Sequence, residues 1–245
     1  MRYKIIDQRQ QRIDKEVEKE RRKFVYGTYI ISTINVLLTL IVAFYLVKND
    51  QFVDNAVKYT VIIFFPYLLS LYFTKKIYNK KLVTIVVNLY YIFGMLVSDI
   101  LFGMTLGNFF HFIIEAGNGR QIIPAILVTM LTYVYSIFSN ISGFLKRNKK
   151  TVVWGMVGIY VCQLFIVKGK VLTIIVDIIA VIFSLLELKI NVKEVSNKFD
   201  YLTNNGKRRE INLLPFMIQE AIGLYLEMLV AIEEILKLGL DSNDD

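Results

Sequence analysis

Long apolar segments separated by clusters of Lys and Arg are the feature that most limits how this chain can fold. Six of these segments are Phe24–Val47, Tyr59–Thr74, Leu82–Phe110, Gln121–Leu145, Thr151–Val167 and Val171–Leu186. Most of them approach or exceed the roughly 20 residues with which a helix crosses a bilayer. The chain is 55% hydrophobic with only three prolines, and soluble domains are usually less apolar. We therefore predict an all-α, polytopic membrane protein.

The number of basic residues alternates from one connection to the next. Lys and Arg number nine before the first segment, then two, four, one, four, two and six in the successive flanks. Because basic flanks stay on the cytosolic side, this alternation predicts six crossings of the cell membrane with the N-terminus cytosolic. We expect a charged cytosolic arm of helical composition at 1–23, a transmembrane domain at 24–240 with a cytosolic loop at 188–212, and an acidic tail at 241–245.

The last apolar segment, Leu213–Leu240, is long enough for a seventh crossing but carries several carboxylates. Glu220, Glu227 and Glu234 are seven residues apart, so they share one face of a helix, which Glu233 widens. Such a face is costly in lipid and must face protein, water or the cytosol. A helix on the membrane surface is the alternative, although interfacial helices usually present Lys and Arg. The tail has no basic residue, which favours the seventh crossing.

Two motifs stand near the C-terminus, "IFSLLELKI" at the end of the sixth segment and "AIGLYLEMLVAIEEILKLG" in the seventh. They resemble the last two signatures of the Bax-inhibitor (transmembrane BAX inhibitor motif) family, with Glu187 and Glu227 where that family has aspartates. Weaker similarity in "FGMLVSDILF" and "AILVTMLTYVYSIF" extends the resemblance along nearly the whole chain in span order. The departures are Glu instead of Asp at both acidic positions, Val230 in place of an asparagine, Asp99 where the family tends to have proline, and a longer loop between the last two helices.

This resemblance implies a bundle of seven transmembrane helices with the last helix central, acting as a pH-sensitive calcium leak channel. Glu187 and Glu227 would form its proton-sensing pair, and Lys75 or Lys76 would latch onto that pair. Two carboxyl groups in contact cannot both ionise cheaply, so the pair would share one proton. With both ionised, they would offer oxygen ligands to a hard cation such as calcium. The alternative is that Glu187 caps its helix, Glu227 lies on a wet face and the lysines are only cytosolic anchors.

Other polar residues interrupt the apolar segments. Asp99 and Asp177 lie in the third and sixth segments, and acids embedded in a membrane are functional candidates by default. Asp99 is deeper from the cytosolic side and is the better pore candidate. His111 and Glu115 lie near the outer end of the third segment, where a lone histidine is more often a boundary residue than a ligand. Cys162 is expected to be a buried small side chain.

The sequence contains no H-E-x-x-H, G-x-S-x-G or P-loop motif, so we expect neither an enzyme nor a cofactor. No metal site is expected apart from calcium ligation by Glu187 and Glu227. The basic clusters lack the aromatic-interleaved surface typical of nucleic-acid binding, which leaves the bilayer and a permeant cation as partners. The alternative function is a small-solute transporter or the membrane subunit of a larger transport complex.

Overall fold

A computed structural model describes residues 2–73, 81–139, 149–165, 170–204 and 213–242, and within these ranges the regular structure is entirely helical. The α-helices are α1 (Arg2–Lys48), α2 (Ala56–Phe73), α3 (Lys81–Glu115), α4 (Ile122–Phe138), α6 (Lys149–Phe165), α7 (Lys170–Asn204) and α8 (Leu213–Ser242). A single 3₁₀ turn, η2 (Gly119–Gln121), connects α3 to α4. The predicted all-α bundle is therefore confirmed.

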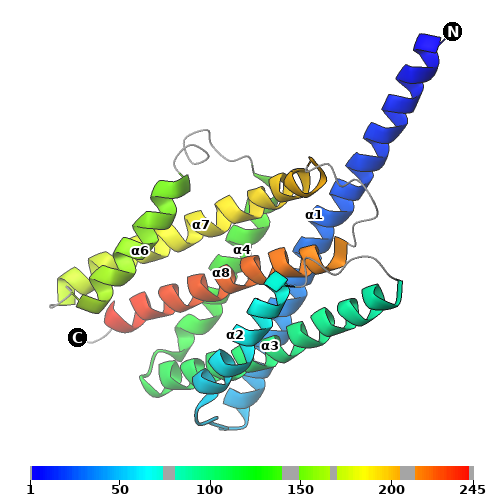
Figure 1. Cartoon of the computed structure of the whole chain (residues 1–245). Coiled ribbons are helices and arrows are strands. Elements are labelled where there is room, and N and C mark those ends of the chain that lie inside the picture. Colours follow the sequence, from blue (N-terminus) through cyan, green and yellow to red (C-terminus); the bar gives the residue numbers. More distant parts are fainter. Residues whose placement is uncertain (1, 74–80, 140–148, 166–169, 205–212, 243–245) are drawn as a thin grey trace.

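Two of the helices are longer than the apolar segments that they contain. The charged arm and the first apolar segment form one unbroken helix, α1, whose first turns extend beyond the other helices (Figure 1). Helix α7 likewise continues past Leu186 as far as Asn204, so most of the predicted loop at 188–212 is helical. By contrast, α4 ends at Phe138, because Ser139 adopts an extended conformation with φ −76° and ψ 153°.

The long apolar helices are typical of a membrane protein. Among the described residues, four helical stretches are long and apolar enough to cross a bilayer: Lys15–Lys48, Thr84–Glu115, Gly119–Phe138 and Leu213–Leu240. Shorter apolar helices lie at Ala56–Tyr67 and Lys150–Ile159. The predicted second, fifth and sixth segments thus fall on α2, α6 and α7, outside this set of four, and their crossings remain predictions.

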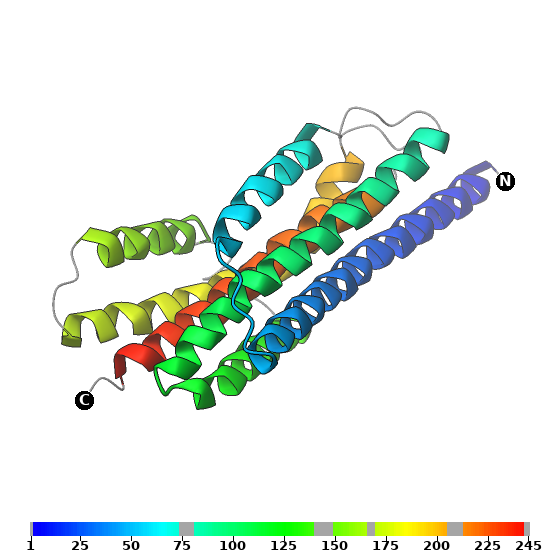
Figure 2. The same ribbon diagram turned by 90° about the horizontal axis from the view of Figure 1, so that it is seen from below.

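Helix α8 lies in the middle of the bundle. It contacts α1, α3, α4 and α7, and both views place it between α7 and α3 (Figures 1 and 2). Between Leu213 and Leu240, Gly223 alone is exposed. Helix α2 packs on α3 and helix α6 packs on α7, so each of these shorter helices covers a neighbour of α8. These contacts place the last helix at the centre of the described bundle, as the sequence led us to expect.

Two glycines allow α1 and α3 to approach closely. A Cβ atom at Gly103 would lie 2.6 Å from Cβ of Val42 and 2.9 Å from the carbonyl oxygen of Thr39. At Gly107 it would lie 3.2 Å from Cα of Ala43. Glycines four residues apart are a common interface between membrane helices, because they allow backbones to meet. This contact fixes the position of the α3 turn before Gly103, which carries Asp99.

Candidate functional site

Two carboxylates of α8, those of Glu220 and Glu227, contact α7 in a shared register. Lys198 makes an ion pair with Glu220, and the side-chain amide of Asn191 donates a hydrogen bond to Oε1 of Glu227. Lys198 and Asn191 are seven residues apart, as are Glu220 and Glu227, so the two antiparallel helices keep one pairing pattern over two turns. The next step of this pattern places Ser184 opposite Glu234, and both side chains are buried. The acidic face of α8 is thus accommodated by polar residues of α7.

The same register locates the predicted pair of glutamates. Glu187 lies one turn before Asn191 on α7, where the pairing pattern places it opposite Ala231 rather than Glu227. Both glutamates are partly buried and each has interactions within the protein. Asn191 is therefore the α7 residue that directly holds Glu227, with Glu187 one helical turn away. Direct contact between Glu187 and Glu227 stays a prediction.

The C-terminal end of the acidic face carries its own cation. Lys237 lies 2.8 Å from Oε1 of Glu233 and 3.2 Å from Oε1 of Glu234. The Glu234 side chain is 1% exposed, whereas Glu233 is about half exposed. Pairs at i, i+3 and i, i+4 meet on the same helix surface, so Lys237 neutralises part of the charge where α8 ends.

Helix α1 contributes a stripe of small polar side chains to the interior. The stripe consists of four residues that are all fully buried: Thr28, Ser32, Asn35 and Thr39. Ser32 shares a hydrogen bond of 2.6 Å with the hydroxyl of Tyr133 on α4. Thr39 shares one of 2.6 Å with the hydroxyl of Tyr225 on α8. Hydrogen bonds between side chains therefore join α1 to two helices inside the bundle.

Asp99 is a buried acid whose carboxyl group lacks a hydrogen-bond partner in the described part of the chain. Its side chain on α3 is 2% exposed, and neither carboxyl oxygen has a hydrogen-bond partner among the described residues. Its backbone carbonyl accepts a hydrogen bond of 3.2 Å from Oγ1 of Thr39, which ties it to the stripe on α1. Asn35, one turn earlier on that stripe, also has no hydrogen-bond partner for its amide within the described part of the chain. A carboxyl group and an amide that are buried in this way are costly.

Of the other residues singled out from the sequence, the structure describes Asp177, His111 and Glu115. Asp177 is buried on α7, at 3% exposure, and interacts within the protein. Nδ1 of His111 lies 3.5 Å from Oε1 of the exposed Glu115, one turn later on α3, as suits a helix boundary. Lys75 and Lys76 lie outside the described residues. In the part of the chain that the structure describes, no three His, Cys, Asp or Glu side chains gather as a metal site.

Sequence reasoning missed Asn191 and the stripe on α1. Asn191 lies in the segment that was expected to be a loop, and a single asparagine in a loop does not by itself indicate a functional site. The stripe had a readable signal, because Thr28, Ser32, Asn35 and Thr39 are spaced by four, three and four residues within an apolar run. That spacing places them on a single helical face, and small polar residues on such a face typically mark contacts between membrane helices.

No family model, no curated protein and no solved structure matches this chain. The resemblance to the Bax-inhibitor family therefore rests on the motifs quoted above.

Proposed function

We propose that this protein is a pH-sensitive cation leak channel rather than an enzyme, with calcium as the permeant ion. The observation that carries the proposal is the burial of the carboxyl side chains of Asp99, Asp177 and Glu234, each at most 3% exposed, inside an apolar helical bundle. Ionisable groups inside membrane proteins are retained mainly where they serve ions or protons. Burial of the acids supports a cation pathway, whereas the choice of calcium depends on the resemblance to the Bax-inhibitor family.

The proposed topology has seven crossings, with the N-terminus in the cytosol and the C-terminus outside. It is supported by the alternation of basic flanks and by the tail without Lys or Arg, since basic residues are retained in the cytosol. The test is a cysteine introduced as S242C in a C162S background. We expect labelling by an impermeant maleimide added outside intact cells. Labelling only after the cytosolic face is opened would show that α8 does not cross.

The proposed switch lies between α7 and α8 and consists of Glu227, Asn191 and Glu187. At low pH the two carboxyls share a proton, and the hydrogen bond from Asn191 to Glu227 keeps the helices together. At higher pH both carboxyls ionise, and their repulsion weakens the helix contact while their oxygens become ligands for a hard cation. Asp99, on the other side of α8, is the proposed site through which the cation passes the bundle interior.

The experiment is calcium flux through the purified protein in liposomes, measured with an enclosed dye over a series of pH values. We expect the wild type to leak without any partner and to leak faster as the pH rises. The E187Q and E227Q variants should each lose this pH dependence, because the remaining carboxyl has no acidic neighbour with which to share a proton. The double variant should add little, because the two groups act as one unit. E233Q is the matched control, since Glu233 is on the same helix but about half exposed.

Three results would separate the alternatives. Unchanged pH dependence in both E187Q and E227Q would eliminate the glutamate switch while leaving the channel intact. Loss of flux in D99N with normal pH dependence in the residual current would assign the pathway to Asp99. Absence of flux from the wild type at every pH would contradict the channel and favour a membrane subunit that acts with a partner.

A further inference from the structure

The cytosolic part of α1 has two chemically different faces. On one face, Val17 packs against the hydrophobic core, and Nη2 of Arg21 binds Oδ2 of Asp200 on α7 at 3.0 Å. Nε of Arg21 also donates a hydrogen bond of 2.9 Å to Ser196. This face is fixed to the extension of α7 beyond the predicted sixth segment. The opposite face of α1 is directed away from the rest of the bundle.

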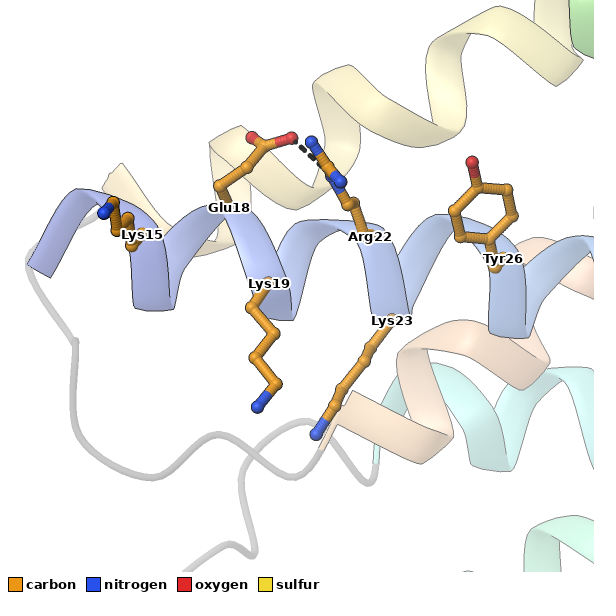
Figure 3. A pocket seen from close by; sticks show the side chains of 6 residues that line it. All are labelled: Lys15, Glu18, Lys19, Arg22, Lys23 and Tyr26. Carbon is orange, nitrogen blue, oxygen red and sulfur yellow. Dashed lines mark hydrogen bonds and ion pairs between the residues drawn. The ribbon is translucent and has the colours of Figure 1, made fainter. Parts of the chain in front are cut away.

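The open face is a basic groove of about 740 Å³. It is lined by Lys15, Glu18, Lys19, Arg22, Lys23 and Tyr26 (Figure 3). Arg22 is paired with Glu18 through a hydrogen bond of 3.1 Å. Lys15, Lys19 and Lys23 have no carboxylate partner among the described residues, and their spacing of four places them on the same helix face. Figure 3 shows the side chains of Lys19 and Lys23 extending to the same side of α1.

These lysines continue the face of α1 that is directed away from the bundle. Further along the helix the same face exposes large apolar side chains, namely Tyr26, Ile30, Ile34, Leu37 and Ile41. From Lys15 onward, the successive spacings along this line are three or four residues, which is the period of one helical face. In a membrane, a continuous apolar stripe of this kind contacts acyl chains. The lysines then lie directly above those lipids, at the level of their headgroups.

Tyr26 marks the change from apolar to basic. Its side chain is 60% exposed, and tyrosine prefers the interface between acyl chains and headgroups. At 1.5 Å per residue, Lys23, Lys19 and Lys15 lie roughly 5, 10 and 16 Å beyond Tyr26 along the helix axis. Lysine side chains bend toward the headgroup level while their stems cover apolar surface. Lys19 and Lys23 are therefore within reach of lipid phosphates, and Lys15 lies at the outer edge.

We propose that Lys15, Lys19 and Lys23, with Arg22 and Tyr26, bind the phosphate headgroup of an anionic phospholipid whose acyl chains lie against Ile30 and Ile34. Continuity with the apolar stripe favours a lipid over a free anion, because a soluble phosphate gains nothing from Ile30 and Ile34. Basic residues close to a leaflet that contains anionic lipids are attracted to it electrostatically. The site would hold α1 upright against α7 and does not depend on ion conduction.

The test uses native mass spectrometry of the full-length protein from mixed micelles that contain equal amounts of phosphatidylglycerol and phosphatidylcholine. We expect the wild type to retain phosphatidylglycerol preferentially. In the K15Q/K19Q/K23Q variant this preference should fall roughly tenfold or more. The charge-conserving K15R/K19R/K23R variant should keep it. The matched control is K48Q/K58Q/K150Q, which removes three exposed lysines at other places.

Each outcome bears directly on the proposal. Equal preference in the wild type and K15Q/K19Q/K23Q, or an equal loss in K48Q/K58Q/K150Q, would overturn the assignment to this groove. Inorganic phosphate added to the micelles should not displace the lipid at millimolar concentration. Complete displacement by phosphate would show that the groove binds a soluble anion, and the lipid assignment would be wrong. This test measures lipid retention and not calcium flux. A negative result would therefore overturn the lipid site without bearing on the proposed channel.

Discussion

Glu227 and Asp99 are carboxyl groups on different helices of one bundle, and the protein treats them differently. Glu227 faces α7, where Asn191 donates a hydrogen bond to it and the pairing pattern repeats at Lys198 and Glu220. Asp99 faces the interior from α3, with its backbone held by Thr39 and its carboxyl oxygens without a hydrogen bond in the described structure. The first acid belongs to a helix interface, whereas the second is retained in spite of its cost.

The difference separates an acid that is tied to a helix contact from one that has no such tie among the described residues. An acid with a matched donor stabilises the contact in which it lies, and its removal leaves the donor unsatisfied. An acid without a donor destabilises the protein, and such groups commonly persist at functional sites. The predictions below compare the two environments by changing one residue in each.

The largest effect is expected from opening the contact that encloses Asp99. G103V would place its side chain against Val42 and the backbone of Thr39, and overpacking of this kind costs roughly 3 kcal/mol. The G223V change on α8 is the control, because a Cβ at Gly223 meets no described residue within 4 Å. Thermal unfolding in detergent would measure both. Equal melting temperatures for the two variants would mean that the close approach of α1 and α3 does not hold the bundle.

The next effect distinguishes a partnered amide from an unpartnered one. N191L removes the donor to Glu227 and leaves that carboxyl partly buried, which should cost about 2 kcal/mol. N35L removes an amide that has no hydrogen-bond partner among the described residues, and it should be neutral or stabilising because an apolar group replaces a buried polar one. Denaturation of the two variants under the same conditions is the measurement. A larger loss in N35L than in N191L would reverse the comparison.

A smaller effect of opposite sign is expected at Asp99 itself. D99N keeps the shape but cannot ionise, so it should stabilise the protein by about 1 kcal/mol at neutral pH. At acidic pH the wild-type carboxyl is protonated and the two proteins should unfold at similar temperatures. The advantage of D99N should therefore increase as the pH rises. If D99N is less stable than the wild type at every pH, Asp99 has a partner that stabilises it.

The smallest effect is expected at the ion pair between Arg21 of α1 and Asp200 of α7. D200N removes the charge that binds Arg21, and both side chains are partly exposed. Exposed ion pairs contribute about 0.2–1 kcal/mol, and the effect should diminish in high salt. Unfolding of D200N at low and high ionic strength would measure it. A salt-independent loss would point to altered packing of Val17 instead of a lost ion pair.

The sequence was sufficient for the helical architecture because apolar length and charge distribution decide it. The bounds of the last helix at Leu213 and its acidic face at Glu220, Glu227 and Glu234 follow from hydropathy and a spacing of seven. Asp99 could be singled out because a lone acid in a long apolar segment is conspicuous. These features depend on neighbours along the chain, which a single sequence contains.

The partners of these residues could not be predicted in the same way. That Glu227 is held by Asn191 depends on the register between α7 and α8, which hydropathy and spacing along the chain do not reveal. The expectation that Glu187 meets Glu227 came from the resemblance of motifs. Such a resemblance does not determine which residues of α7 and α8 lie opposite each other. The close approach at Gly103 similarly depends on which face of α3 packs against α1. Several faces of α3 are apolar, so the sequence alone does not show which of them makes this contact.

The unbroken course of α1 has a mechanical consequence. Its 47 residues form a rod of about 70 Å without an internal proline, so a tilt applied at one end is transmitted to the other rather than absorbed by a hinge. Helix α1 is bound to α7 at Arg21 and to Tyr225 of α8 at Thr39. Thr39 lies about 27 Å from Arg21 along the helix axis. A partner or a lipid that pulls the charged arm sideways therefore exerts torque on the hydrogen bond between Thr39 and Tyr225, beside Asp99.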